Sequence, residues 1–191
     1  MSKGRLEAFS DGVLAIIITI MVLEFVPPQE SDFAALRPLI PKFLSYVLSF
    51  IFLGIYWNNH HHLWQAVERV GGSVLWANLH LLFWLSLIPF VTSWMGESHF
   101  STIPVVLYGL VLWLAATAYY IMVRTLMAFH PKDSTLAAAI GNGAKERISL
   151  IIYTAAIPLA FVSSLIAIGF YVVVAILWLI PDRRIENRLG R

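Results

Sequence analysis

The chain contains no cysteine and carries little charge. The absence of cysteine excludes disulfides, thiolate metal ligands and thiol nucleophiles. Charged residues make up only 13% of the 191 residues, about half the share that is usual in a soluble domain. The net charge of +2 is too small to indicate a nucleic-acid partner, and we expect none.

Sequence motifs of catalysis and of metal binding are also missing. There is no G-x-S-x-G, Walker A or H-E-x-x-H sequence, so we expect neither an enzyme nor a bound cofactor. His60, His61 and His62 are consecutive, and side chains on a helix that point about 100° apart cannot converge on one metal ion. The T-V-G-Y-G sequence of a carbonyl-lined potassium filter is absent as well.

Apolar residues dominate what is present. They make up 59% of the chain, and the mean hydropathy is +0.78. About 20 apolar residues cross the hydrocarbon core as a helix. We therefore predict an all-α, polytopic membrane protein in contact with lipid, with a single domain over residues 1–191. The predicted spans cover residues 5–26, 33–64, 74–95, 102–129, 146–162 and 164–181.

Two of these spans are irregular. Pro38 and Pro41 predict a kinked or interfacial start to the second span. The apolar block at residues 148–180 is too long for one ordinary span. Pro158 and the pair Ser163-Ser164 favour a hairpin of two short helices that breaks near residues 161–164. One long tilted helix is the alternative, and it would give five spans.

The distribution of lysine and arginine bears on this choice. With six spans, only Arg37 and Lys42 fall on one side of the membrane, and the other eleven cationic residues fall on the opposite side. Cytoplasmic loops carry the excess of lysine and arginine. The pattern therefore favours six spans, in the cell membrane, with both termini in the cytoplasm.

The first span, RLEAFSDGVLAIIITIMVLEF, is the most informative stretch. Ile16, Ile20 and Leu23 lie within about 40° of one another on a helix, and Thr19 lies about 60° to one side of Ile16. From spacing alone, this stripe is either a packing face, against lipid or a neighbouring helix, or a functional surface.

Asp11 lies inside the same span and about 140° away from Ile16 on the helix. A carboxylate within a membrane helix is costly and needs a partner or access to water. One interpretation is that Asp11, with Ser10, is a buried anchor for polar groups on the second and third spans. Candidate partners there are Trp57, Asn58, His60 and Asn78. The other interpretation is that Asp11 reaches water at the cytoplasmic end.

Arg5, Phe9, Ser10 and Asp11 form an R-x-x-x-F-S-D motif, which is long and uncommon. The motif resembles the signature of the transmembrane protein 175 family, and residues 15–24 also resemble that family's first helix. Members are cation channels, lysosomal in animals, with smaller bacterial relatives.

The resemblance implies a homotetramer whose first helices line a central pore. Bulky side chains at the positions of Ile16, Ile20 and Leu23 would form its narrow part. The F-S-D residues would support the pore helix through a Trp-x-x-His sequence, matched by Trp57 and His60, and an asparagine, matched by Asn78. Pro89-Phe90 matches a later Pro-Phe of the family.

Two hypotheses of different classes follow. The first is a potassium-permeable cation channel, in which other monovalent cations also pass along Ile16, Thr19, Ile20 and Leu23, and Glu24 attracts cations to the outer mouth. The second is a membrane scaffold or assembly protein that conducts no ions, in which the stripe is only an interface. A secondary transporter is disfavoured because the sequence shows no internal repeat and no pair of broken helices.

Overall fold

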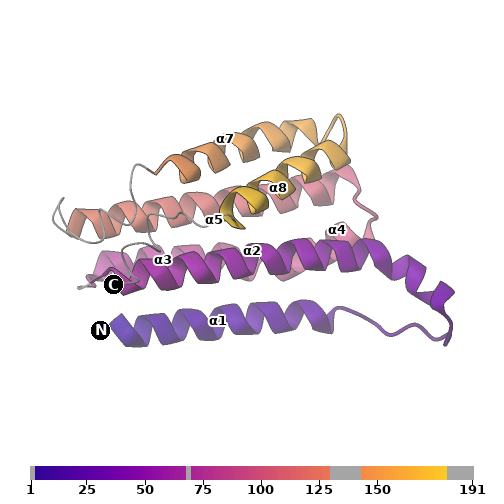
Figure 1. Cartoon of the computed structure of the whole chain (residues 1–191), viewed down its shortest axis with the longest axis horizontal. Coiled ribbons are helices and arrows are strands. Elements are labelled where there is room, and N and C mark those ends of the chain that lie inside the picture. The colour runs from indigo at the N-terminus through magenta and orange to yellow at the C-terminus, as the bar shows by residue number, and fades with distance from the viewer. Residues whose placement is uncertain (1–2, 68–69, 130–142, 180–191) are drawn as a thin grey trace.

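The computed structural model describes residues 3–67, 70–129 and 143–179. All regular structure in these ranges is helical (Figure 1). Six of the eleven cationic residues that were assigned to the cytoplasmic side lie outside the described residues, namely Arg69, Lys132, Arg183, Arg184, Arg188 and Arg191. Positions 180 and 181 of the sixth predicted span also lie outside them. The helices are α1 (Lys3–Leu23), the 3-10 helix η1 (Phe33–Leu39), α2 (Ile40–Gln65), α3 (Gly72–Ser86), α4 (Ile88–Glu97), α5 (Thr102–Phe129), α7 (Ala144–Leu159) and α8 (Ser164–Leu179).

The chain runs alternately up and down through six helical rods, with α3 and α4 together forming one of them (Figure 1). The prediction of an all-helical membrane protein with six helices is therefore confirmed for the described residues. The apolar block after residue 148 forms two helices separated by a turn at residues 160–163, and α8 runs back toward the end of the bundle where α1 begins.

Prolines define several helix boundaries. Pro41 lies in the first turn of α2 and Pro89 in the first turn of α4, where a missing backbone N–H removes no helical hydrogen bond. Pro38 lies in η1, which separates the loop after α1 from α2. The second span thus begins irregularly at its two prolines, as its sequence indicates.

Within the part of the chain that the structure describes, four rods are long and apolar enough to cross a membrane, namely residues 3–23, 33–65, 72–97 and 102–128. Helices α7 and α8 have 16 residues each, fewer than the roughly 20 that span the hydrocarbon core. The helix α8 carries no charged residue and is mostly apolar, whereas α7 begins with a charged turn at residues 145–147.

The rods pack in layers. α1 lies at one edge of the bundle against α2, α3 and α4, and the α7–α8 pair lies at the opposite edge against α5 and α2 (Figure 1). The interior between them holds large side chains that are almost fully buried, including Trp64, Phe52, Tyr108 and Tyr171. One face of α1 therefore packs against helices of the same chain. The opposite face of α1 is not covered by any helix in the described residues.

A cluster of three hydroxyl groups joins α2, α4 and α5 within this interior. Ser49 Oγ lies 2.6 Å from Thr92 Oγ1 and 3.0 Å from Tyr108 Oη. All three side chains are buried. Hydroxyls without water must bond to one another or to the backbone, so the cluster fixes the relative positions of the three helices.

Helices α2 and α4 approach each other closely at Gly96. A Cβ atom at this position would lie 2.6 Å from the Cα atom of Lys42, which is closer than real Cβ contacts allow. The approach therefore requires glycine, and it places the start of α2 beside the end of α4.

We predict that Gly96→Ala destabilises the protein by about 1–3 kcal/mol, because the added methyl group meets backbone and not a side chain that could move. Thermal unfolding in detergent, followed by tryptophan fluorescence, measures the change. Gly54→Ala, within α2, is the matched control, since nothing lies within 4 Å of its Cβ position. The control is expected to be neutral or up to about 1 kcal/mol more stable. Equal unfolding temperatures for the two variants would contradict the close approach.

Candidate functional site: the first helix and its contacts

Helix α1 has one face buried in the chain and one face uncovered. The buried face carries Leu6, Ser10, Leu14, Ile17 and Met21. These residues follow the helical periodicity of three and four, so they form a continuous stripe against α2, α3 and α4. The uncovered face carries the predicted stripe, which the fold leaves accessible.

A buried hydrogen-bond network holds this orientation. Asn78 Nδ2, on α3, donates to Ser10 Oγ at 2.9 Å, and Ser10 Oγ donates in turn to the Leu6 carbonyl of its own helix at 2.9 Å. His60 Nε2, on α2, lies 2.8 Å from Asn78 Oδ1, and Trp64 Nε1 donates to the same ring nitrogen at 2.8 Å. The network therefore connects three helices through side chains that are all almost fully buried.

His60 is the most constrained member of this network. One ring nitrogen is either a donor or an acceptor, so Nε2 serves Trp64 or Asn78 at any moment. Its Nδ1 atom is buried and has no hydrogen-bond partner within the described part of the chain. A network that is only partly satisfied is sensitive to any loss of a partner.

Asp11 lies beside the buried network and not within it. Its Oδ1 accepts a hydrogen bond of 3.1 Å from Trp57 Nε1, and the Trp57 side chain is 46% exposed. Of the two motif residues, Ser10 lies in the fully buried network, whereas Asp11 is half-buried and contacts the predicted partner Trp57. A supporting role of Asp11 for the pore helix stays a prediction. Consecutive residues on a helix point about 100° apart, and this difference separates the two.

A second exposed contact joins α1 to α2 on the same side as Asp11. Glu7 Oε1 lies 3.3 Å from His61 Nδ1, and the His61 ring stacks on Trp57 with centroids 6.0 Å apart. Arg5 and Phe9, the first two motif residues, lie on the uncovered face, with Phe9 50% exposed. Of the four motif residues, Ser10 and Asp11 therefore contact α3 and α2. Arg5 and Phe9 do not face these helices.

The predicted stripe lies on the uncovered face of α1. Ile16 is 59% exposed, Ile20 is 40% exposed and Leu23 is 79% exposed. Thr19 is exposed as well, and its hydroxyl lies 2.9 Å from the Ile16 carbonyl and 3.1 Å from the Ala15 carbonyl, to which it donates. With its proton directed to the helix backbone, the hydroxyl oxygen has lone pairs free to accept from water or to face a cation.

An open groove runs along this face between α1 and the α3–α4 rod. Its volume is about 750 Å³, and its lining combines Ile16, Ile20, Phe90 and Trp94 with the polar side chains Glu24, Ser93 and Glu97 at one end. The groove is apolar along most of its length, and its charged residues all lie toward the C-terminal ends of α1 and α4.

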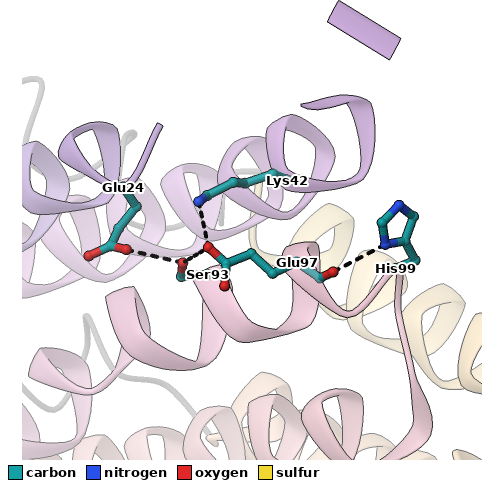
Figure 2. A network of polar contacts seen from close by, with 5 residues as sticks. All are labelled: Glu24, Lys42, Ser93, Glu97 and His99. Atoms are coloured by element: carbon teal, nitrogen blue, oxygen red, sulfur yellow. Dashed lines mark hydrogen bonds and ion pairs between the residues drawn. The ribbon is translucent and has the colours of Figure 1, made fainter. Parts of the chain in front are cut away.

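The polar end of the groove contains residues that the sequence analysis did not combine. Ser93 Oγ lies 3.2 Å from Glu24 Oε2 and 3.4 Å from Glu97 Oε1, and Lys42 Nζ forms an ion pair of 2.7 Å with Glu97 Oε1 (Figure 2). His99 Nδ1 lies 3.1 Å from the Glu97 carbonyl oxygen. Ser93 and Glu97 are four residues apart on α4, a spacing that places them on one face, but nothing in the sequence pairs that face with Glu24 or Lys42.

No group of three or more metal-ligating side chains occurs in residues 3–67, 70–129 and 143–179. The consecutive histidines diverge as their spacing predicts, with His60 in the buried network and His61 against Glu7 and Gln65. The arrangement as a whole is an amphipathic surface on one helix, supported from behind by hydrogen bonds and bounded at one end by charge.

We predict that Asn78→Ala destabilises the protein more than Asp11→Ala does. Loss of Asn78 removes the buried hydrogen bond that joins α1 to α3 and the contact of α3 with His60 on α2, at a cost of about 1–3 kcal/mol, whereas Trp57 can turn to water when Asp11 is lost. Size-exclusion chromatography and thermal unfolding of the detergent-solubilised variants measure the difference. A larger loss in Asp11→Ala would show that the half-exposed contact is the stronger support.

Comparisons with known proteins agree with this architecture. Residues 5–89 match the family model described as "Endosomal/lysosomal potassium channel TMEM175". A potassium channel of Chryseobacterium sp. (strain P1-3) is 57% identical over 189 residues, which cover 99% of this chain and 98% of that protein. The endosomal/lysosomal proton channel TMEM175 of Homo sapiens is 27% identical over 191 residues, which cover 90% of this chain and 38% of the human protein.

A solved structure shares the fold over nearly the whole chain. The crystal structure of a lysosomal potassium-selective channel TMEM175 homolog from Chamaesiphon minutus superposes with a TM-score of 0.79 at 27% identity, covering 93% of this chain and 96% of that chain. The resemblance stated from the R-x-x-x-F-S-D motif is thus confirmed by full-length similarity, by the family model and by the fold. The chain belongs to the TMEM175 family.

Proposed function

We propose that this protein is a potassium-permeable cation channel whose pore is lined by the uncovered face of α1. The observation that carries the proposal is the division of α1 into a face fixed by Ser10 and a face left accessible with Ile16, Thr19, Ile20 and Leu23. Similarity to three bacterial potassium channels supports potassium as the permeant ion.

One uncovered helix cannot enclose a pore, so the channel requires several chains around an axis. A closed cyclic ring is the simplest arrangement of identical chains, and the family resemblance implies a homotetramer. The groove beside α1 and the exposed aromatic side chains of α4, Phe90 and Trp94, offer apolar surface for the neighbouring chain. Lipid surrounds the remaining apolar faces.

Conduction in such a pore depends on an apolar constriction. An ion that passes a ring of isoleucine side chains must shed water with nothing to replace it, and such rings gate by dewetting. Thr19, between Ile16 and Ile20, offers the only hydroxyl on this face of α1 and can replace part of the lost hydration. Without carbonyl ligands, selectivity for potassium over sodium is expected to be modest. No cofactor is required.

The proposal is tested with purified protein in liposomes, by comparing the flux of potassium, sodium and a large organic cation. A channel gives potassium flux that does not saturate in the millimolar range and excludes the large cation. Flux no greater than that of empty vesicles would favour the non-conducting scaffold, and saturation with a requirement for a coupled ion would favour a transporter.

We predict that Ile16→Asn raises cation flux and weakens the preference for potassium over sodium. The amide can replace part of the hydration that the isoleucine ring removes, so a several-fold increase is expected. Ile20→Asn and Leu23→Asn are expected to act in the same direction with smaller effect. Ile151→Asn is the matched control, because Ile151 is 68% exposed on α7, at the edge of the bundle opposite α1. Increased flux in the control and not in Ile16→Asn would place the constriction elsewhere.

We further propose that the protein lies in the cell membrane with both termini in the cytoplasm, because eleven of the thirteen lysine and arginine residues then face inward. We predict that an epitope tag after Arg191 is inaccessible to antibody in intact cells and accessible after permeabilisation. A tag placed in the loop between Val26 and Phe33 is the control and is expected to be accessible in intact cells. The opposite pattern would reverse the orientation.

A further inference from the structure

At the C-terminal end of α1, carboxylates outnumber ammonium groups. The inference drawn from this excess of negative charge rests on the proposed function. Two carboxylates, Glu24 and Glu97, face one hydroxyl from Ser93, and one ammonium group, that of Lys42, lies beside them (Figure 2). Both carboxylates lie within 3.4 Å of the same oxygen atom, so they are closer together than the Debye length of about 8 Å at physiological ionic strength. Each therefore lies within the field of the other.

The ammonium group pairs with one of the two carboxylates. Lys42 Nζ lies 2.7 Å from Glu97 Oε1, and the Lys42 side chain is only 13% exposed. The close approach of α2 to α4 at Gly96 places the Lys42 backbone directly over the residue that precedes Glu97. The pairing is thus built into the packing of two helices.

Glu24 receives much weaker compensation. Glu24 contacts the Ser93 hydroxyl at 3.2 Å, and Glu97 lies 3.4 Å from the same oxygen atom. Since a hydroxyl has one proton, the two carboxylates share a single donor. The side chain of Glu24 is exposed at the end of α1. The carbonyl end of α1 adds a partial negative charge at the same place.

We propose that Glu97 is a positioning residue for cation entry: it holds Lys42 away from Glu24, so that Glu24 keeps an uncompensated negative charge at the mouth of the pore. Without the Glu97 carboxylate, the Lys42 ammonium group turns to Glu24, whose carboxylate contacts the same Ser93 hydroxyl as Glu97 does. The mouth then loses its negative charge although Glu24 itself is unchanged.

The local potential can be measured without ion conduction, because the chain has no native cysteine. Val26→Cys places a single thiol at a position that is 72% exposed and two residues beyond Glu24. The ratio of its reaction rates with a cationic trimethylammonioethyl and an anionic sulfonatoethyl methanethiosulfonate reports the potential. Low ionic strength lengthens the range of the field and increases the expected change.

In the Val26→Cys background, Glu97→Gln is expected to lower the cationic-to-anionic rate ratio about two- to fivefold. Adding Lys42→Gln to Glu97→Gln is expected to restore the ratio. Arg37→Gln is the matched control for Lys42→Gln, because Arg37 lies in η1 on the same side of the bundle, and it is expected to have little effect. A ratio unchanged by Glu97→Gln would overturn the proposal.

The decisive comparison removes Glu24 first. In a Glu24→Gln background, Glu97→Gln is expected to change the ratio by a smaller factor than it does when Glu24 is present. Only the direct field of Glu97 is then lost, because Lys42 has no carboxylate at position 24 to approach; coupled residues are non-additive. An equal fold-change in both backgrounds would show that Glu97 acts only through its own field, and would overturn its positioning role.

Potassium flux in liposomes provides the functional readout. Glu97→Gln is expected to reduce flux about two- to fivefold at 10 mM salt and to have little effect at 1 M salt, where screening is nearly complete. If the wild type conducts no ions while the thiol ratios follow the expected order, the channel proposal fails and the positioning role holds. If the wild type conducts but the ratios do not respond to Glu97→Gln, the positioning role fails and the channel proposal holds.

Discussion

The hydrogen bond from Asn78 to Ser10 determines which side of α1 faces outward. It is 2.9 Å long, fully buried, and connects α1 to a helix more than sixty residues away in the sequence. In the hydrocarbon core no water can replace a lost partner, so rotation of α1 that separates the two groups leaves both unsatisfied. The apolar residues on either side, Leu14 and Ile17 among them, add packing but would tolerate a small rotation, whereas the hydrogen bond does not.

The same physical constraint shapes the rest of the bundle. Between helices in lipid there is no hydrophobic driving force, so association depends on close packing and on hydrogen bonds between side chains. The hydroxyl cluster of Ser49, Thr92 and Tyr108 connects three helices, and Trp178 Nε1 donates to Ser149 Oγ at 2.8 Å between α8 and α7. Gly96 supplies the close packing where α2 meets α4. Each layer of the fold thus has at least one specific polar or small-residue contact.

These contacts also connect the support of α1 to the charge at its end. Gly96 permits the approach of α2 to α4, the approach brings Lys42 to Glu97, and Ser93 on the same face of α4 reaches Glu24. The position of Glu24 relative to the proposed pore therefore depends on helices that do not line it. A substitution deep in the packing of α2 and α4 could alter cation entry without any change in the stripe.

The class of the molecule follows from the amino-acid sequence alone, because composition and the length of apolar runs report burial in lipid directly. It indicated six helices, the proline-marked boundaries and a stripe of Ile16, Ile20 and Leu23 on one face of the first helix, since helical periodicity is a local property. Whether that face packs against a neighbour or stays uncovered was left open by the spacing. The motif indicated the family, which the comparisons confirm.

Which of two adjacent polar residues is buried depends on the packing of helices and could not be read from the sequence. Ser10 and Asp11 differ by one position, and the packing of α1 against α2 and α3 turns one inward and leaves the other half-exposed. The pairing of Lys42 with Glu97 was likewise invisible in the sequence, because 55 residues separate them and a spacing rule applies only within one helix. Contacts between helices depend on how rods are packed and rotated, and no local pattern encodes that rotation.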